Sequence, residues 1–178
     1  MELLELCKDE YQGELDRRNE IRRSLTLPIG LSVLFGGAIY SLLAGFPWAE
    51  VEMLTLKAFL TVSIPGILFW AAAVIFLIRA HVGFSYGYVP TAKEIIEYKE
   101  ALVLFYGDKG CEDQSQSDVE AYLQSEFSNT AHHNFLNNNS KAAYLHEANR
   151  RLVVVLIALG LMSLVHLINP FLEILYDK

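Results

Sequence analysis

The stretch that decides the fold runs from Ser117 to Ile168 and reads SDVEAYLQSEFSNTAHHNFLNNNSKAAYLHEANRRLVVVLIALGLMSLVHLI. Its apolar or small side chains recur at steps of three and four, which is the spacing of one face of an α-helix. They are Val119, Tyr122, Leu123, Phe127, Ala131, Phe135, Ala142, Leu145, Ala148 and Leu152. No proline or glycine lies between Gly110 and Gly160. The helix can therefore continue into Leu152–Val165, which carries no charge.

A helix over this whole stretch would be much longer than a membrane is thick. At about 1.5 Å per residue it would be roughly 75 Å long, against about 30 Å for the hydrocarbon core of a bilayer. We therefore expect one helix, or two nearly collinear helices, whose first part lies in water and whose second part lies in lipid.

The distribution of apolar residues indicates the class of protein. Hydrophobic residues make up 53% of the 178 and collect at 25–46, 58–78 and 152–168, whereas the segments between are charged. This segregation is typical of an integral membrane protein. The net charge of −7 argues against a general nucleic-acid-binding surface, which needs clustered basic residues. We expect the lipid bilayer as a partner and no direct binding of nucleic acid.

The fold class predicted is an all-α integral membrane protein. It combines a transmembrane helical hairpin, a cytoplasmic helical hairpin and a long helix that continues into a third span. The predicted divisions are 1–24 as a cytoplasmic amphipathic helix, 25–78 as the transmembrane hairpin, 79–151 as the cytoplasmic helical region, and 152–178 as the third span with an outer tail. Because the cytoplasmic region is small, we also expect copies of the chain to associate.

Basic residues predict the orientation in a bacterial inner membrane. They flank the predicted cytoplasmic ends of the spans as Arg17, Arg18, Arg22, Arg23, Arg79, Arg150 and Arg151. The loop between the first two spans holds Glu50 and Glu52 against a single Lys57. The positive-inside rule then places the N-terminus and residues 79–151 in the cytoplasm and the C-terminus in the periplasm. Cys7 and Cys111 fall on the cytoplasmic side, where reduced thiols are expected.

Two pairs of residues match the capping box of a helix start. In Thr91 with Glu94, and in Ser117 with Glu120, a hydroxyl residue is followed three positions later by glutamate. The first pair predicts a helix that ends near Gly107. The second pair predicts the beginning of the long helix.

Small residues on the first span predict a surface for close helix packing. Gly37, Ser41 and Gly45 follow one another at steps of four, so they share a face on which another helix can approach. On the third span, a second face carries small and polar residues at steps of three. These are Gly160, Ser163, His166 and Asn169. Two interpretations of that face remain open, a contact between helices or the lining of an aqueous path.

An asparagine-rich stretch forms the most unusual polar cluster. Asn134, Asn138 and Lys141 share a face of the long helix, and His146 lies beside it. The cluster is interpreted either as a hydrated or interhelical hydrogen-bonding surface, or as a continuation of a pore wall formed by the third span. No metal site is expected, because His132 and His133 lie about 20 Å along the helix from His146. No cofactor is expected either, since the chain has no Gly-rich phosphate loop.

The layout of short spans around a helical cytoplasmic segment with an Asn-rich helix resembles small membrane effectors of bacterial antiviral defence. It is most similar to the membrane accessory proteins of type VI-B CRISPR loci. That family carries a divergent HEPN-like motif, an arginine and a histidine separated by four to six residues. The matching positions here are Lys141 and His146, with lysine in place of arginine. Lysine lacks the planar bidentate contact to phosphate that arginine makes, so ribonuclease activity is not expected.

This resemblance implies a homo-oligomeric inner-membrane pore, a ring with an octamer as the best guess, that disturbs the membrane during phage infection. It also implies a functional link to a CRISPR RNA-guided nuclease. Two alternatives stay open, a membrane-tethered HEPN-like ribonuclease that uses His146 and a non-conducting membrane adaptor. The activating signal, the subunit number and the helix that lines any pore do not follow from the sequence.

Overall fold

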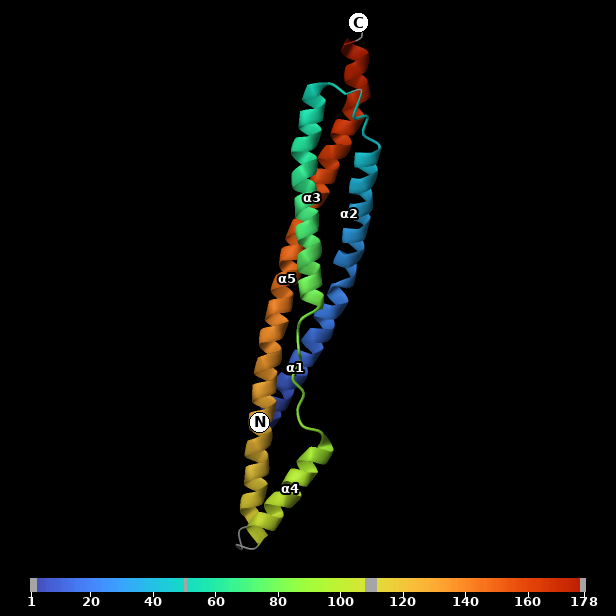
Figure 1. Ribbon diagram of the computed structural model, residues 1–178. Coiled ribbons are helices and arrows are strands. Elements are labelled where there is room, and N and C mark those ends of the chain that lie inside the picture. Colours follow the sequence, from blue (N-terminus) through green and yellow to red (C-terminus); the bar gives the residue numbers. More distant parts are fainter. Residues whose placement is uncertain (1–2, 50, 108–111, 177–178) are drawn as a thin grey trace. The chain divides into compact units, whose positions relative to one another are not determined.

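A computed structural model describes the backbone of residues 3–49, 51–107 and 112–176, with the side chains of these ranges apart from 112–113 and 169–176. All the regular structure in these ranges is α-helical (Figure 1). The helices are α1 (Leu3–Ser24), α2 (Thr26–Ala44), α3 (Met53–His81), α4 (Ala92–Gly107) and α5 (Glu112–Tyr176). The prediction of an all-α protein is confirmed.

Three helical stretches of the described chain are long and apolar enough to cross a membrane. They are Leu3–Ala44, which joins α1 to α2, then Met53–His81, and Gln114–Ile168 within α5. Each contains one of the predicted apolar segments, so the prediction of three such helices is confirmed.

The chain folds into two compact units. One unit holds Met1–Ile21 with Phe84–Ser140, and the other holds Arg22–Gly83 with Lys141–Lys178. We call them the polar unit and the apolar unit. This division by contact differs from the four consecutive segments expected from the sequence, because α1 and α5 each contribute residues to both units.

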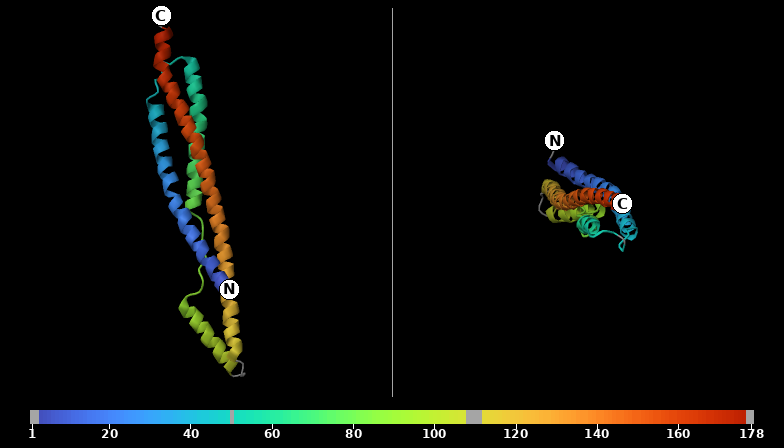
Figure 2. Two further views of the ribbon diagram at one scale, coloured as in Figure 1. Left: turned by 180° about the vertical axis from the view of Figure 1, so that it is seen from behind. Right: turned by 90° about the horizontal axis from the view of Figure 1, so that it is seen from above.

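In the apolar unit, α2, α3 and the C-terminal part of α5 lie side by side, as the two views from the side show (Figure 1 and the left part of Figure 2). Its core contains two clusters of buried side chains, Ile39 with Val155 and Leu159, and Phe46 with Phe59 and Met162. The rings of Phe46 and Phe59 stack with centroids 3.9 Å apart. The three helices therefore close on one another through large apolar side chains.

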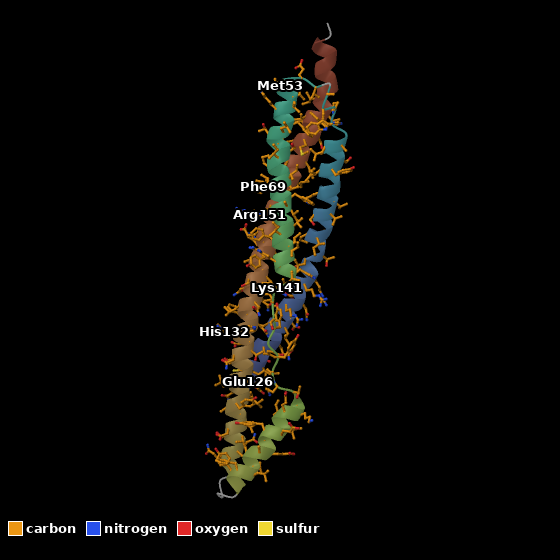
Figure 3. The ribbon with its side chains drawn as sticks, viewed as in Figure 1. Met53, Phe69, Glu126, His132, Lys141 and Arg151 are labelled. Carbon is orange, nitrogen blue, oxygen red and sulfur yellow. The ribbon has the colours of Figure 1, made fainter. Side chains whose placement is uncertain are left out.

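The outer surface of the apolar unit is also apolar. Large side chains point away from the helices all round it, among them those of the labelled Met53 and Phe69 on α3 (Figure 3). Leu34 on α2 is 68% exposed and Leu156 on α5 is 57% exposed. A helix bundle that is apolar both inside and outside is suited to a lipid surrounding.

Helix α2 contacts α3 through small groups and one indole. The Trp70 Nε1–H of α3 donates to the Ser32 carbonyl of α2 at 2.8 Å. Next to that bond, a Cβ atom placed on Gly36 would lie 2.7 Å from Trp70 Cζ2. Glycine at position 36 therefore lets the indole reach the α2 backbone.

Arg151 joins α5 to α3 at one end of the apolar unit (Figure 3). Its guanidinium carbon lies 4.1 Å from the centroid of the Phe76 ring on α3. The same guanidinium donates to the Glu147 carbonyl at 3.0 Å and forms an ion pair with the Glu147 carboxylate. These contacts hold the charged guanidinium of Arg151 against α3, while the aliphatic part of its side chain can cover apolar surface.

In the polar unit, aromatic rings pack the helices together. Tyr11 of α1 meets Phe127 of α5 edge to face, with centroids 5.6 Å apart. Tyr98 of α4 lies 4.6 Å from Tyr122 of α5, measured between ring centroids. These pairs set α1 and α4 against the first part of α5.

The two predicted capping boxes have opposite outcomes. Thr91 and Glu94 form theirs: the Thr91 N–H donates to Glu94 Oε2 at 2.6 Å, and the Glu94 N–H donates to Thr91 Oγ1 at 3.4 Å. The bonds that the Thr91 N–H and the Thr91 hydroxyl donate to the Glu94 carboxylate hold its pKa below the usual value. The box at Ser117 and Glu120 was wrong, because α5 begins at Glu112 and already contains both residues. The polar residues before Ser117 are compatible with a helix and extend it.

Candidate functional site

The asparagine cluster holds segment 84–90, which belongs to no helix, against α5. Asn134 is completely buried and bonds both backbone polar groups of one residue, Gly87. Its Oδ1 accepts the Gly87 N–H at 2.9 Å, and its Nδ2 donates to the Gly87 carbonyl at 3.2 Å. Because a segment outside regular structure cannot pair its own peptide groups, such side-chain partners are needed where it is covered.

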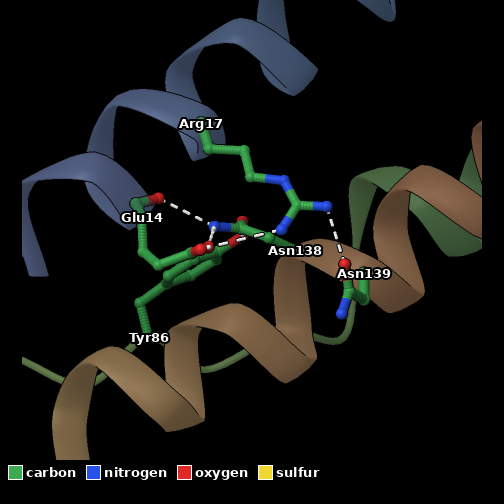
Figure 4. Close-up of polar contacts among 5 residues, drawn as sticks. All are labelled: Glu14, Arg17, Tyr86, Asn138 and Asn139. Atoms are coloured by element: carbon green, nitrogen blue, oxygen red, sulfur yellow. Dashed lines mark hydrogen bonds and ion pairs between the residues drawn. The ribbon is translucent and has the colours of Figure 1, made fainter. Parts of the chain in front are cut away.

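Asn138, one turn further along α5, joins three parts of the polar unit (Figure 4). Its Nδ2 donates to the Glu14 carbonyl at 2.7 Å and to Glu14 Oε2 at 2.8 Å, both on α1. Its Oδ1 accepts the Tyr86 hydroxyl of segment 84–90 at 2.5 Å. This side chain is also completely buried, so one amide connects α1, α5 and the segment.

Two further α5 side chains meet the Ser85 carbonyl. Asn137 Nδ2 donates to it at 2.7 Å, and His133 Nε2 lies 2.8 Å from it. Two residues further along the segment, a Cβ atom on Gly87 would lie 2.9 Å from Thr130 Cγ2. Only glycine lets the backbone come this close to α5.

Two arginines of α1 complete the cluster. Arg17 donates to Asn139 Oδ1 at 2.6 Å and lies 3.6 Å from Glu14 Oε1 (Figure 4). The Arg18 guanidinium carbon lies 4.4 Å from the centroid of the Tyr86 ring, and Arg18 also donates to the Tyr88 hydroxyl at 3.0 Å. Burial raises the pKa of Tyr86, and the positive charge of Arg18 acts in the opposite direction. The phenol therefore stays protonated and donates to Asn138 near neutral pH.

These bonds show what the asparagine face does in a single chain. The amides of Asn134 and Asn138 form hydrogen bonds with the chain's own backbone and side chains, and both side chains have no exposed surface. The expectation that they continue a pore wall does not agree with this burial. The geometry is that of a hydrogen-bonding surface between helices, which was the other interpretation of the cluster.

The positions matched to the HEPN-like motif lie on different sides of α5. Lys141 is half-buried and His146 is exposed. Five residues correspond to about 140° of rotation around a helix, so the two side chains point in different directions. This rotation follows from the spacing of the motif itself, so the geometry of α5 does not decide whether the two side chains act together. Among the described residues, no group of three or more His, Cys, Asp or Glu side chains is arranged to hold a metal ion.

In the apolar unit, the polar face of the third predicted span is only partly covered. Gly160 is exposed, Ser163 and His166 are half-buried, and the side chain of Asn169 is outside the described residues. The His166 ring lies 6.4 Å from the Phe46 ring, measured between centroids. Its Nδ1 is buried and has no hydrogen-bond partner in the described chain. An unpaired imidazole nitrogen in apolar surroundings is costly. Because this nitrogen is enclosed by the chain itself, only the uncovered part of the half-buried ring is open to groups from outside the chain.

The small-residue face of α2 is turned away from the chain's own packing. Gly37, Ser41 and Gly45 are all exposed, and a Cβ atom on Gly37 would meet nothing within 4 Å. The chain uses the neighbouring face instead, with Ile39 in the core and Gly36 against Trp70. The face predicted for close packing is therefore exposed, and at Gly37 the described part of the chain leaves open space.

The sequence did not identify the partners of the asparagines. The run of glycine and aromatic residues at 83–88 was the available signal, since a segment of this composition needs side-chain partners to be ordered against a helix. Glu14 and Arg17 gave no such signal, because charged residues at these spacings are common on exposed helices.

No protein-family model, curated protein or solved structure matches the chain. The fold and its surfaces therefore define the class of protein directly. In the part of the chain that the structure describes, this is a helical protein with three helices long and apolar enough to cross a membrane.

Proposed function

We propose that copies of this chain assemble in a bilayer and enclose a path for ions or small solutes between them. The observation that carries the proposal is the exposed small-residue face of α2, formed by Gly37, Ser41 and Gly45. In lipid, helices associate by close backbone approach at small residues rather than by hydrophobic burial. A face of this kind that the chain itself leaves uncovered is suited to a helix from another copy.

The packing of the apolar unit supports a path between chains rather than within one. Phe59, Val155 and Met162 have no exposed surface and fill the space between the three helices. Conduction through a single chain would require this core to open. An assembly needs no such change, since the path forms where several copies meet.

The polar side chain of His166 supports a hydrated environment for part of this assembly. The His166 ring and the Ser163 side chain, three residues apart on α5, are both half-buried, so part of each reaches the surface of the chain. In an oligomer, these groups would meet water or polar groups of the adjacent copy. We include Ser163 and His166 in the proposed path, together with Asn169 from the sequence pattern, and leave Asn134 and Asn138 out because they are bonded inside the chain.

The biological setting proposed rests on the resemblance alone. It is a pore or permeabilising effector of the bacterial inner membrane, arranged as a ring, that supports antiphage defence linked to a CRISPR RNA-guided nuclease. We propose no enzymatic role, because position 141 carries lysine where the HEPN-like motif has arginine.

The mass of the detergent-solubilised particle and solute release from loaded vesicles test the proposal together. We expect an oligomer that releases an entrapped dye. His166→Leu should make the path more apolar and favour its dewetting, so release should fall about tenfold or more while the particle mass stays unchanged. A monomeric wild-type particle would contradict the proposal.

The matched control is His81→Leu, the same exchange at an exposed position at the end of α3. We expect release by this variant to equal that of the wild type. Full release by an intact His166→Leu oligomer would instead exclude this side of α5 from the path.

The proposed orientation has its own test in intact cells. In a chain whose two natural cysteines are replaced by serine, Ala49→Cys should react with a membrane-impermeant thiol reagent, because residue 49 belongs to the predicted periplasmic connection between α2 and α3. Lys99→Cys on α4 should react only after the cells are opened. The reverse pattern would invert the orientation.

A further inference from the structure

An apolar groove lies between α2 and α5 on the surface of the apolar unit. It has a volume of about 340 Å³ and is walled by Leu27, Leu31 and Phe35 from one helix and by Leu152, Val153 and Leu156 from the other. The α2 residues follow one another at steps of four, and Leu156 lies three and four residues after Val153 and Leu152, so each wall is one continuous stripe along its helix.

One end of the groove is polar. Ser24 precedes Leu27 by three residues, Asn149 precedes Leu152 by three residues, and both line the groove. The two helices run in the same direction along the groove, so both polar residues lie at the same end (Figure 1). The groove is therefore amphipathic along its length, with an apolar body and one polar mouth.

Basic residues lie next to the polar mouth in the sequence. Arg22 and Arg23, both exposed, directly precede Ser24, and Arg23 lies one helical turn before Leu27. Arg150 follows Asn149 and lies one turn before Val153, with 73% of its side chain exposed. The acidic group here is Glu147, whose carboxylate lies 3.5 Å from Arg150 and also pairs with Arg151. The mouth still holds more positive than negative charge.

We propose that this groove binds one anionic phospholipid, with an acyl chain along the apolar walls and the headgroup phosphate at Arg23 and Arg150. Basic pockets between spans at the cytoplasmic border are suited to anionic headgroups, and guanidinium groups form strong charge-assisted bonds to phosphate. A peptide is a poorer occupant, since the walls offer its backbone few polar partners. This site does not depend on pore formation, because every residue that forms it comes from a single chain.

Native mass spectrometry of the purified full chain with equal amounts of phosphatidylglycerol and phosphatidylcholine tests the proposal. We expect the wild type to retain phosphatidylglycerol preferentially. Arg23→Gln and Arg150→Gln should each reduce that preference about fivefold, as expected for loss of one basic residue near an anionic headgroup. The matched control is Arg79→Gln, the same charge change on α3, a helix that contributes no residue to the groove. It should leave the preference unchanged.

A second pair of variants tests the apolar body. Leu31→Trp should fill the groove and reduce retention of both lipids, whereas Leu34→Trp, at a position 68% exposed and outside the groove, should not. Equal retention of the two lipids by the wild type would overturn the proposal, and so would an equal effect of Arg79→Gln. A changed particle mass in Leu31→Trp with unchanged lipid retention would show a second copy in the groove, which also overturns it. The same spectra give the subunit number, so failure of lipid binding is distinguished from failure of assembly.

Discussion

Asn138→Leu is expected to release segment 84–90 and α1 from α5 in the polar unit. The change removes the bonds of the Asn138 amide to Glu14 and Tyr86 and leaves the half-buried Tyr86 without this acceptor. Loss of such a buried site with one charged partner costs about 3 kcal/mol. Hydrogen–deuterium exchange at segment 84–90 should therefore become roughly a hundredfold faster.

The matched control is Asn129→Leu, also on α5 but exposed, where the amide bonds only Ser125 Oγ at 3.2 Å. Its effect on exchange should be less than threefold, because exposed substitutions change stability by about 0.5 kcal/mol or less. If Asn138→Leu changed solute release and left exchange as in the wild type, Asn138 would face a path and the bonding described above would be incorrect.

The second large effect on stability is expected from a substitution at Gly36, whereas the same substitution at the adjacent Gly37 should act on assembly. In Gly36→Leu the new side chain meets Trp70, whose ring cannot easily move because its Nε1 bonds the Ser32 carbonyl. Overpacking of this kind costs about 3 kcal/mol. Helices α2 and α3 should separate, and the unfolding temperature of the solubilised protein should fall by several degrees.

In Gly37→Leu the added side chain points into open space beside the chain, so the bundle itself should keep its stability. The small-residue face would however lose its close approach to another copy, and the particle mass should fall from oligomer to monomer. Sedimentation or mass photometry measures this directly. An oligomer that survives Gly37→Leu would show that the face contacts lipid, and the proposed assembly would need another interface.

The sequence alone determined the features that depend on local pattern. Helical periodicity without proline or glycine predicted that α5 passes through Arg150 into an apolar segment, and charge-free runs predicted three helices able to cross a membrane. The cap at Thr91 and Glu94 was also predictable, because it joins residues only three apart. The start of α5 was not, since polar residues before Ser117 are compatible with either a loop or a helix.

Only the tertiary structure decided how the polar residues are used. The sequence pattern placed Asn134 and Asn138 on one face of α5 but could not show what covers it, because Glu14 lies 124 residues away from Asn138 along the chain. Gly36 and Gly37 are equally small, and their roles differ because the rotation of α2 against Trp70 turns one inward and the other outward. Local pattern fixes which residues share a helix face, whereas packing between distant segments decides which face is buried.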